Sequence, residues 1–351
     1  MKLSRIINAS GKMTILGGSK VDESVAEKMV FGAQNLFLME ELIEVSGNHI
    51  ANLFGVESAS IVASASAGIA QAVASVISND HVLDPYNTNN LRRNIVMPKG
   101  HNVDYGTTIA IPIQMGGGVV VEAGYANACF LDHVESKIDE NTAALLFVKS
   151  HHAVQKGMPD LKEFIELGHK HGLPVIVDAA AEGDVAYYHH LGADAVIYSG
   201  TKTFEGPTSG VVIGTHDFIT KLRHQSKGIG RVMKVGKEGI LGLVQALDNH
   251  FVHEDVSLDD QKKRLEIFHS GFEGILKSRN VQDGAGRPIL RCELTFSSSE
   301  EAVRIVNHLK SGDVKIYTRD YRANEGIIEL DIRDLSDDEM KEIVVAIKEG
   351  L

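Results

Sequence analysis

Short apolar runs rich in β-branched residues recur along the first two thirds of the chain, with amphipathic stretches between them. Seven runs predict strands: Ser60–Ala63, Asn94–Met97, Val119–Glu122, Ala144–Val148, Pro174–Asp178, Ala195–Ser199 and Val211–Gly214. The intervening stretches predict helices, as in Leu161–His171, where apolar and charged positions repeat with helical spacing. This alternation predicts a doubly wound α/β fold with a mostly parallel, seven-stranded sheet.

After about Asp255 the pattern changes. The elements predicted there are a helix around Gln261–Leu276, a strand at Ile289–Phe296, a helix at Ser299–Lys310, strands near Val314–Tyr317 and Ile327–Ile332, and a helix at Asp337–Glu349. We therefore predict a large domain over residues 51–254 and a smaller α+β C-terminal domain over 255–351. Residues 1–50 are expected to pack with the small domain or with a partner subunit.

Composition narrows the class of protein. With 351 residues, of which 43% are hydrophobic, the chain can build two sizeable cores without disulfide support. The formal net charge of −12 disfavours nucleic acid and anionic membranes as partners. Cys129 and Cys292 have no metal-site or disulfide spacing, and no signal sequence or long apolar segment is visible. We expect a cytoplasmic protein.

The strongest chemical pattern joins two predicted strands. VIVDAAAEGD at 175–184 places Asp178 at the end of one strand, and IYSGTKTFEGPTSGVVIG at 197–214 places Lys202 just after the next. Consecutive parallel strands end at the same edge of a sheet, where ligands bind in such folds. Pyridoxal phosphate needs this pair, because a lysine amine forms the imine and an acid keeps the pyridine nitrogen protonated. Lys202 and Asp178 are therefore the predicted catalytic residues.

Small and hydroxyl-bearing residues offer a phosphate site. The segment IVASASAGIAQAVASVI at 61–77 predicts a strand, a turn and a helix beginning near Ala67, whose free N–H groups could bind phosphate. The candidates for cofactor binding here and beside Lys202 are Ser64, Ala65, Ser66, Gly68, Ser199 and Thr201. Tight packing of the helix on the sheet explains the small residues at 64–68 equally well.

Histidines follow two other predicted strands. His101, in PKGHNVDYG at 98–106, is placed to stack on the pyridine ring, although an exposed loop histidine is an equal alternative. His151 and His152 are weaker candidates for the same cleft. None of the 16 histidines has the spacing of a metal site, so no metal is expected.

Basic residues could bind an anionic substrate. Arg231 and Lys234 lie in a glycine-broken segment before a predicted helix. Arg319, Arg322 and Arg333 of the C-terminal region are further candidates, because a guanidinium binds carboxylate or phosphate through two hydrogen bonds. Spacing alone does not choose among them.

Several segments together carry a family resemblance: RIINASGKMTILGGS, SASAGI, KGHNVDYG, MGGGVVVEAGYAN, VDAAAEGD, SGTKTFEGPTSGVVIG and GRVMKVGKEGILGL. Over nearly its whole length the chain resembles the pyridoxal phosphate enzymes that include bacterial selenocysteine synthase (L-seryl-tRNA selenium transferase) and the D-glucosaminate-6-phosphate ammonia-lyases. The resemblance implies the fold type I architecture of aspartate aminotransferase and a homo-oligomer, a dimer or higher.

Within this family the ammonia-lyase branch is favoured. KGHNVDYG and MGGGVVVEAGYAN look closer to it, INASGKM begins by residue 7 so that no tRNA-binding module is expected before it, and the charge is acidic. The resemblance then implies an α,β-elimination that converts D-glucosaminate 6-phosphate to 2-keto-3-deoxygluconate 6-phosphate and ammonia, with Lys202 as the base.

Three alternatives stay open. A tRNA-dependent transferase would have to bind seryl-tRNA. Another amino-acid lyase or an aminotransferase would keep the cofactor and change the substrate. A non-enzymatic relative would keep the fold without the chemistry, against which the presence of Lys202 and Asp178 argues.

Overall fold

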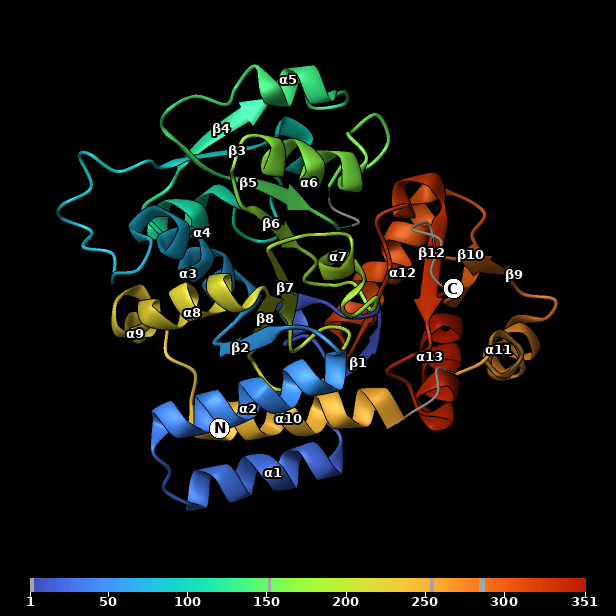
Figure 1. The fold of residues 1–351 in the computed structure, drawn as a ribbon. Coiled ribbons are helices and arrows are strands. Elements are labelled where there is room, and N and C mark those ends of the chain that lie inside the picture. Colours follow the sequence, from blue (N-terminus) through green and yellow to red (C-terminus); the bar gives the residue numbers. More distant parts are fainter. Residues whose placement is uncertain (1–2, 151–152, 253–255, 284–287) are drawn as a thin grey trace. The chain divides into compact units, whose positions relative to one another are not determined.

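The computed structural model describes residues 3–150, 153–252, 256–283 and 288–351. It divides into two compact units, whose helices and strands are drawn in Figure 1. Each unit has its own clusters of buried hydrophobic residues. The larger unit spans residues 21–252, and the smaller combines residues 1–20 with 253–351. His151 and His152, both candidates from the sequence, lie outside the described residues.

The larger unit is built on one seven-stranded sheet, ordered β2-β8-β7-β6-β5-β3-β4. Its strands are β2 (Ser58–Val62), β3 (Asn94–Pro98), β4 (Val119–Ala123), β5 (Thr142–Val148), β6 (Val175–Asp178), β7 (Ala195–Ser199) and β8 (Gly210–Gly214). Every neighbouring pair is parallel except those that β8 makes with β2 and β7. All seven predicted strands are confirmed. Six of these apolar runs are buried almost throughout, as expected for strands covered on both faces, whereas β4 at the edge of the sheet is mostly half-buried or exposed.

Helices cover both faces of this sheet. Side chains of α3 (Ala65–Ser78), α4 (Ala110–Met115) and α8 (His216–His224) belong to the apolar cluster on one face. The other face packs against α2 (Met39–Phe54), α5 (Leu131–Glu135), α6 (Leu161–Lys170), α7 (Tyr187–His190) and α10 (Lys237–Val252). Two further helices are α1 (Glu23–Gln34), which lies beside α10 in Figure 1, and the short α9 (Ile229–Val232).

The smaller unit packs helices on short β-sheets. Its strands are β1 (Arg5–Ala9) paired in parallel with β11 (Val314–Thr318), and β9 (Lys277–Gln282), β10 (Leu290–Thr295) and β12 (Ile327–Asp331) in antiparallel order β12-β10-β9. The helices α11 (Leu258–Phe272), α12 (Ser299–Ser311) and α13 (Asp337–Gly350) supply the rest of its core. The α+β prediction is confirmed, but β1 and β9 were missed. The sequence of β9, KSRNVQ, lies at a sheet edge with no buried residue, so it has no apolar pattern to detect.

The expected N-terminal segment 1–50 divides between the two units. Residues up to 20 belong to the smaller unit because β1 pairs with β11. Residues 21–50 belong to the larger unit because α1 and α2 pack with α10. No helix within the described ranges combines the length and apolar character needed to cross a bilayer.

Candidate active site

Lys202 and Asp178 lie at the same edge of the large sheet. Asp178 is the last residue of β6, and it is paired in register with Ile197 of the parallel strand β7. Strand β7 ends at Ser199, three residues before Lys202, and the Ser199 N–H donates to the carbonyl of Ala180. The loops that follow the two strands are therefore joined, which brings the acid and the amine to one site.

Burial and mutual attraction set the charges of this pair. Burial raises the pKa of Asp178 to about 6 even though the charge of Lys202 and a hydrogen bond from the Ala180 N–H (3.1 Å) favour the ionised form. Burial also lowers the pKa of Lys202, against the opposing charges of Asp178 and Glu182. Both shifts have the direction that desolvation in a cleft produces, and they bring the pKa values of the two groups closer together.

The helix α3 begins beside the same loops. Helix α3 starts at Ala65, two residues earlier than predicted, and the Ser64 Oγ accepts from the Ala67 N–H (3.0 Å) as its N-cap. A Cβ added to Gly210 would lie only 2.8 Å from the Ser64 carbonyl carbon, so β8 holds this turn tightly against the sheet. Strand β8 also pairs Gly210 with Ser199, which brings the turn at 64–66 and the loop of Lys202 to the same edge of the sheet.

Polar groups at this edge suit a phosphate. The backbone N–H groups of Ala65 and Ser66 have no hydrogen-bond partner within the described part of the chain, and they stand at the positive end of a 14-residue helix. The hydroxyls of Ser199 and Thr201 lie 3.2 Å apart on the loop before Lys202. The predicted phosphate candidates therefore lie together at this edge, with one exception.

Gly68 is that exception. It is buried in the first turns of α3, and an added Cβ would lie 3.0 to 3.3 Å from side chains of Ile197, Val212 and Val62. The side of Gly68 on which a side chain would stand therefore faces the sheet and not a ligand. The alternative of close packing between helix and sheet therefore explains the glycine, and a phosphate role for Gly68 stays a prediction.

His101 also differs from its prediction. The ring is 0% exposed, with Nε2 3.0 Å from the Val154 carbonyl and Nδ1 accepting from the Val148 N–H at 3.3 Å. Phe147 meets it edge to face, with ring centroids 4.3 Å apart. Burial lowers the pKa of His101 to about 4, so the ring is neutral. No ring face is open to a cofactor, and His101 is a core residue that fixes the loop after β3 to β5.

Two residues of the site were missed from the sequence. Tyr105 donates or accepts a 2.8 Å hydrogen bond with Ser66 at the start of α3, and the charge of Asp178 contributes to raising the pKa of Tyr105 after burial. Glu182 acts on Lys202 through its charge. Both stand within segments singled out above, KGHNVDYG and VDAAAEGD, but only their distances in the fold distinguish them from ordinary loop residues.

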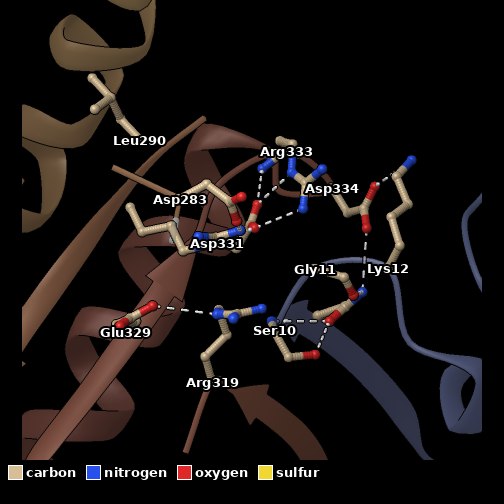
Figure 2. A network of polar contacts seen from close by, with 12 residues as sticks. Ser10, Gly11, Lys12, Asp283, Leu290, Arg319, Glu329, Asp331, Arg333 and Asp334 are labelled. Atoms are coloured by element: carbon tan, nitrogen blue, oxygen red, sulfur yellow. Dashed lines mark hydrogen bonds and ion pairs between the residues drawn. The ribbon is translucent and has the colours of Figure 1, made fainter. Parts of the chain in front are cut away.

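The basic candidates belong to two different units. Arg231 and Lys234 belong to the larger unit, where both are exposed. Arg319 and Arg333 belong to the smaller unit and carry ion pairs there, with Glu329 at 3.3 Å and with Asp331 at 2.8 Å (Figure 2). Arg322 pairs with Glu293 and Glu325.

The residues around Lys202 fit pyridoxal phosphate. The Lys202 amine makes no hydrogen bond or ion pair with any residue in the described ranges, and the Asp178 Oδ2 likewise accepts no hydrogen bond there. One group is thus available to bond a carbonyl carbon and the other to accept from a pyridine N–H. The described residues contain no cluster of three or more His, Cys, Asp or Glu side chains that could hold a metal ion.

Comparison with known proteins finds relatives that match most of the chain. A family model described as L-seryl-tRNA selenium transferase matches residues 6–268. A D-glucosaminate-6-phosphate ammonia lyase of Salmonella typhimurium is 39% identical, over 99% of this chain and 95% of its own. A Streptomyces protein named 5′-C-glycyluridine monooxygenase-decarboxylase is 37% identical, over 99% and 90%. A solved structure of a D-glucosaminate-6-phosphate ammonia-lyase superposes with a TM-score of 0.92 over 99% of this chain and 96% of that one, at 39% identity.

Proposed function

Because the chain belongs to the L-seryl-tRNA selenium transferase family, we propose that it is a pyridoxal phosphate-dependent ammonia lyase acting on D-glucosaminate 6-phosphate. The observation that carries the proposal is the 39% identity to an ammonia lyase across 99% of the chain. The pairing of Lys202 with Asp178 supplies the chemistry that such a lyase needs. The fold is that of the fold type I pyridoxal phosphate enzymes.

The residues of the site have separate tasks. When bound, pyridoxal phosphate supplies an electron sink that stabilises negative charge at the substrate Cα. Lys202 would hold its carbonyl carbon, Asp178 its pyridine nitrogen, and the turn at 64–66 with Ser199 and Thr201 its phosphate. The buried carboxylate of Asp178 keeps a proton on the pyridine nitrogen, because burial makes an unpartnered negative charge unfavourable.

Lys202 is also the base of the reaction. Burial lowers the pKa of its amine, so more of the amine is neutral at a given pH, and neutral Nζ can take the Cα proton of the substrate. The β-hydroxyl then leaves as water with the proton that Lys202 removed from Cα, and one water is consumed when the amino group is released as ammonia. The keto acid and ammonia together therefore have the same elemental composition as the substrate.

Anion binding is assigned to the basic residues. We propose that Arg231, Lys234, Arg319 and Arg333 bind the carboxylate and phosphate of the substrate, since guanidinium and ammonium groups are the usual receptors for both. No nucleic acid or membrane partner is proposed, on the basis of the acidic charge. A reducing cytosolic location is proposed because Cys129 and Cys292 are both buried free thiols.

We further propose that the chain forms a homo-oligomer through the turn between α1 and α2. Leu36 and Leu38 are 94% and 76% exposed there, and Phe31 of α1 is 51% exposed. Adjacent apolar side chains of this size are typical of protein interfaces. Sedimentation should show a dimer or larger species, and Leu36→Glu combined with Leu38→Glu should reduce it to a smaller one.

The decisive assay measures products from D-glucosaminate 6-phosphate. We expect keto acid and ammonia in equal amounts, lost in Lys202→Ala and retained in Lys162→Ala, an exposed lysine of α6. Oxygen consumption with release of carbon dioxide would instead favour the activity named for the Streptomyces relative, which its 37% identity makes the second candidate. Turnover of seryl-tRNA, or of short hydroxy amino acids alone, would also refute the proposal.

A further inference from the structure

The segment RIINASGKM forms a tight turn directly after β1. The Asn8 side chain closes this turn, because Nδ2 donates to the Gly11 carbonyl (2.9 Å) and Oδ1 accepts from the N–H and hydroxyl of Ser10 (3.0 and 2.6 Å). Gly11 then adopts φ +86°, a conformation that side chains disfavour. The turn is thus fixed by its own polar residues and requires glycine at position 11.

Arg333 and Asp331 lie directly against this turn. Nε and Nη2 of Arg333 donate to the two oxygens of Asp331 at 2.9 and 2.8 Å (Figure 2). A Cβ added to Gly11 would lie 2.9 Å from Arg333 Nη2 and 3.0 Å from Asp331 Oδ2. The absence of a side chain at Gly11 therefore provides the space that the Arg333 guanidinium occupies.

Asp331 also forms a buried ion pair with Arg291. Arg291, 2% exposed, donates Nε to Asp331 Oδ2 (3.0 Å) and Nη2 to Asp283 Oδ1 (2.7 Å). Burial acts to raise the pKa of Asp331, but the hydrogen bonds and charge of Arg333 and the charge of Arg291 outweigh it and hold the pKa at about 2. Asp331 is thus an ionised, immobile acceptor.

These contacts fix one edge of the Arg333 guanidinium and leave another open. The side chain is 29% exposed, and Nη1 makes no hydrogen bond with any residue that the structure describes. A planar guanidinium held through Nε and Nη2 presents its remaining N–H groups in a fixed direction. Such a preorganised donor pair is suited to a carboxylate or a phosphate.

We propose that Gly11 and Asp331 are positioning residues that hold the Arg333 guanidinium as the receptor for an acidic group of the substrate. Asp331 sets the orientation of the guanidinium, and the absence of a side chain at Gly11 gives it room. The identity of the substrate rests on the proposed function, whereas the coupling between Gly11 and Arg333 does not.

Gly11→Ala is the informative change, and Gly17→Ala is its matched control. Gly17 lies in the same segment at φ +88°, so alanine strains the backbone similarly, but an added Cβ there has nothing within 4 Å. Asp331→Asn is less useful, because it leaves the buried Arg291 short of its counter-charge and so destabilises the unit. Only Gly11→Ala should displace the Arg333 side chain.

Binding to the cofactor-loaded enzyme is measured by calorimetry with D-gluconate 6-phosphate, the substrate analogue without its amine. We expect Gly11→Ala to weaken binding at least about tenfold, the size of one lost charged hydrogen bond, and Gly17→Ala to change it less than about twofold. In lyase assays the loss should be in KM and not in kcat. In an Arg333→Ala background Gly11→Ala should cause no further loss, because the group it displaces is gone.

Single-group probes identify the acid that is bound. The tenfold effect should appear with D-gluconate if Arg333 receives the carboxylate, and with D-glucitol 6-phosphate if it receives the phosphate. Equal effects of Gly11→Ala and Gly17→Ala on binding, or a further loss from Gly11→Ala in the Arg333→Ala background, would overturn the proposal.

Thermal unfolding without ligand separates this proposal from the proposed function. Gly11→Ala should lower the Tm less in the Arg333→Ala background than in the wild type, whereas Gly17→Ala should lower it equally in both. If that coupling is present while D-glucosaminate 6-phosphate is neither bound nor turned over, the proposed substrate is wrong and the position of Arg333 against Gly11 stands. If the coupling is missing, the positioning proposal fails whatever the lyase assay shows.

Discussion

Asp178→Asn should stabilise the cofactor-free protein while abolishing its activity. Asp178 is 8% exposed, and burial raises its pKa from 3.8 to about 6 after the attraction of Lys202 is included. A raised carboxyl pKa means that folding opposes ionisation, so the ionised group costs stability. The shift means that ionised Asp178 lowers the free energy of unfolding by about 3 kcal/mol. Asparagine has the same shape and no charge, so it avoids this loss.

The pH dependence gives the test its sign. Below the unfolded-state pKa near 4, Asp178 is protonated in the folded and the unfolded protein, so it costs no stability. The loss of unfolding free energy grows as pH rises and is complete above the folded-state pKa near 6. The stability gain of Asp178→Asn should therefore be about 3 kcal/mol at pH 8 and about half of that at pH 5.

Urea unfolding of the cofactor-free protein at pH 5, 6, 7 and 8, at one protein concentration, measures this difference. Asp184→Asn is the control, since Asp184 is an exposed carboxylate in the same loop. Asp178→Asn should also lose at least about a hundredfold in kcat, because asparagine cannot keep the pyridine nitrogen protonated. The reasoning is refuted if Asp178→Asn is less stable than the wild type at pH 8, or if their difference in unfolding free energy does not change with pH. Either result would show that the buried charge of Asp178 does not destabilise the fold.

Four further changes test single features of the site. Lys202→Ala should abolish the visible absorption of bound cofactor and reduce turnover by at least about 10³-fold, and colour that survives would identify another lysine. Tyr105→Phe removes the 2.8 Å bond to Ser66 and should weaken cofactor affinity several-fold, as measured by spectral titration. Gly68→Ala should cost about 1 to 3 kcal/mol in urea unfolding from overpacking and leave cofactor affinity unchanged, so a selective loss of affinity would support the phosphate role. His101→Leu should cost about 1 to 3 kcal/mol, because it leaves the N–H of Val148 and the carbonyl of Val154 unpaired, and it should retain the visible band.

Local sequence was sufficient for the framework of the site. The seven strands of the large sheet were found because each is an apolar run bounded by turn residues, and all except β4 are buried almost throughout. Asp178 and Lys202 follow from the same information, since residues just beyond neighbouring parallel strands meet at one edge. Strand β9 was missed for the converse reason, because an exposed edge strand places no demand on hydrophobic pattern.

What the sequence by itself determined, then, was the succession of strands in the large sheet and the meeting of Asp178 and Lys202 at one edge of that sheet. The tertiary structure alone decided which small or polar residues face a ligand. Gly68 and Gly11 both lie in segments rich in small residues, yet Gly68 accommodates Ile197 of the sheet and Gly11 accommodates the guanidinium of Arg333. His101 and Tyr105 stand four positions apart, yet one is sealed in the core and the other bonds to Ser66 at the site. The succession of strands and the residues at their ends follow from spacing along the chain. Which small or polar residues face a ligand depends instead on the distant side chains that fill the space around each residue.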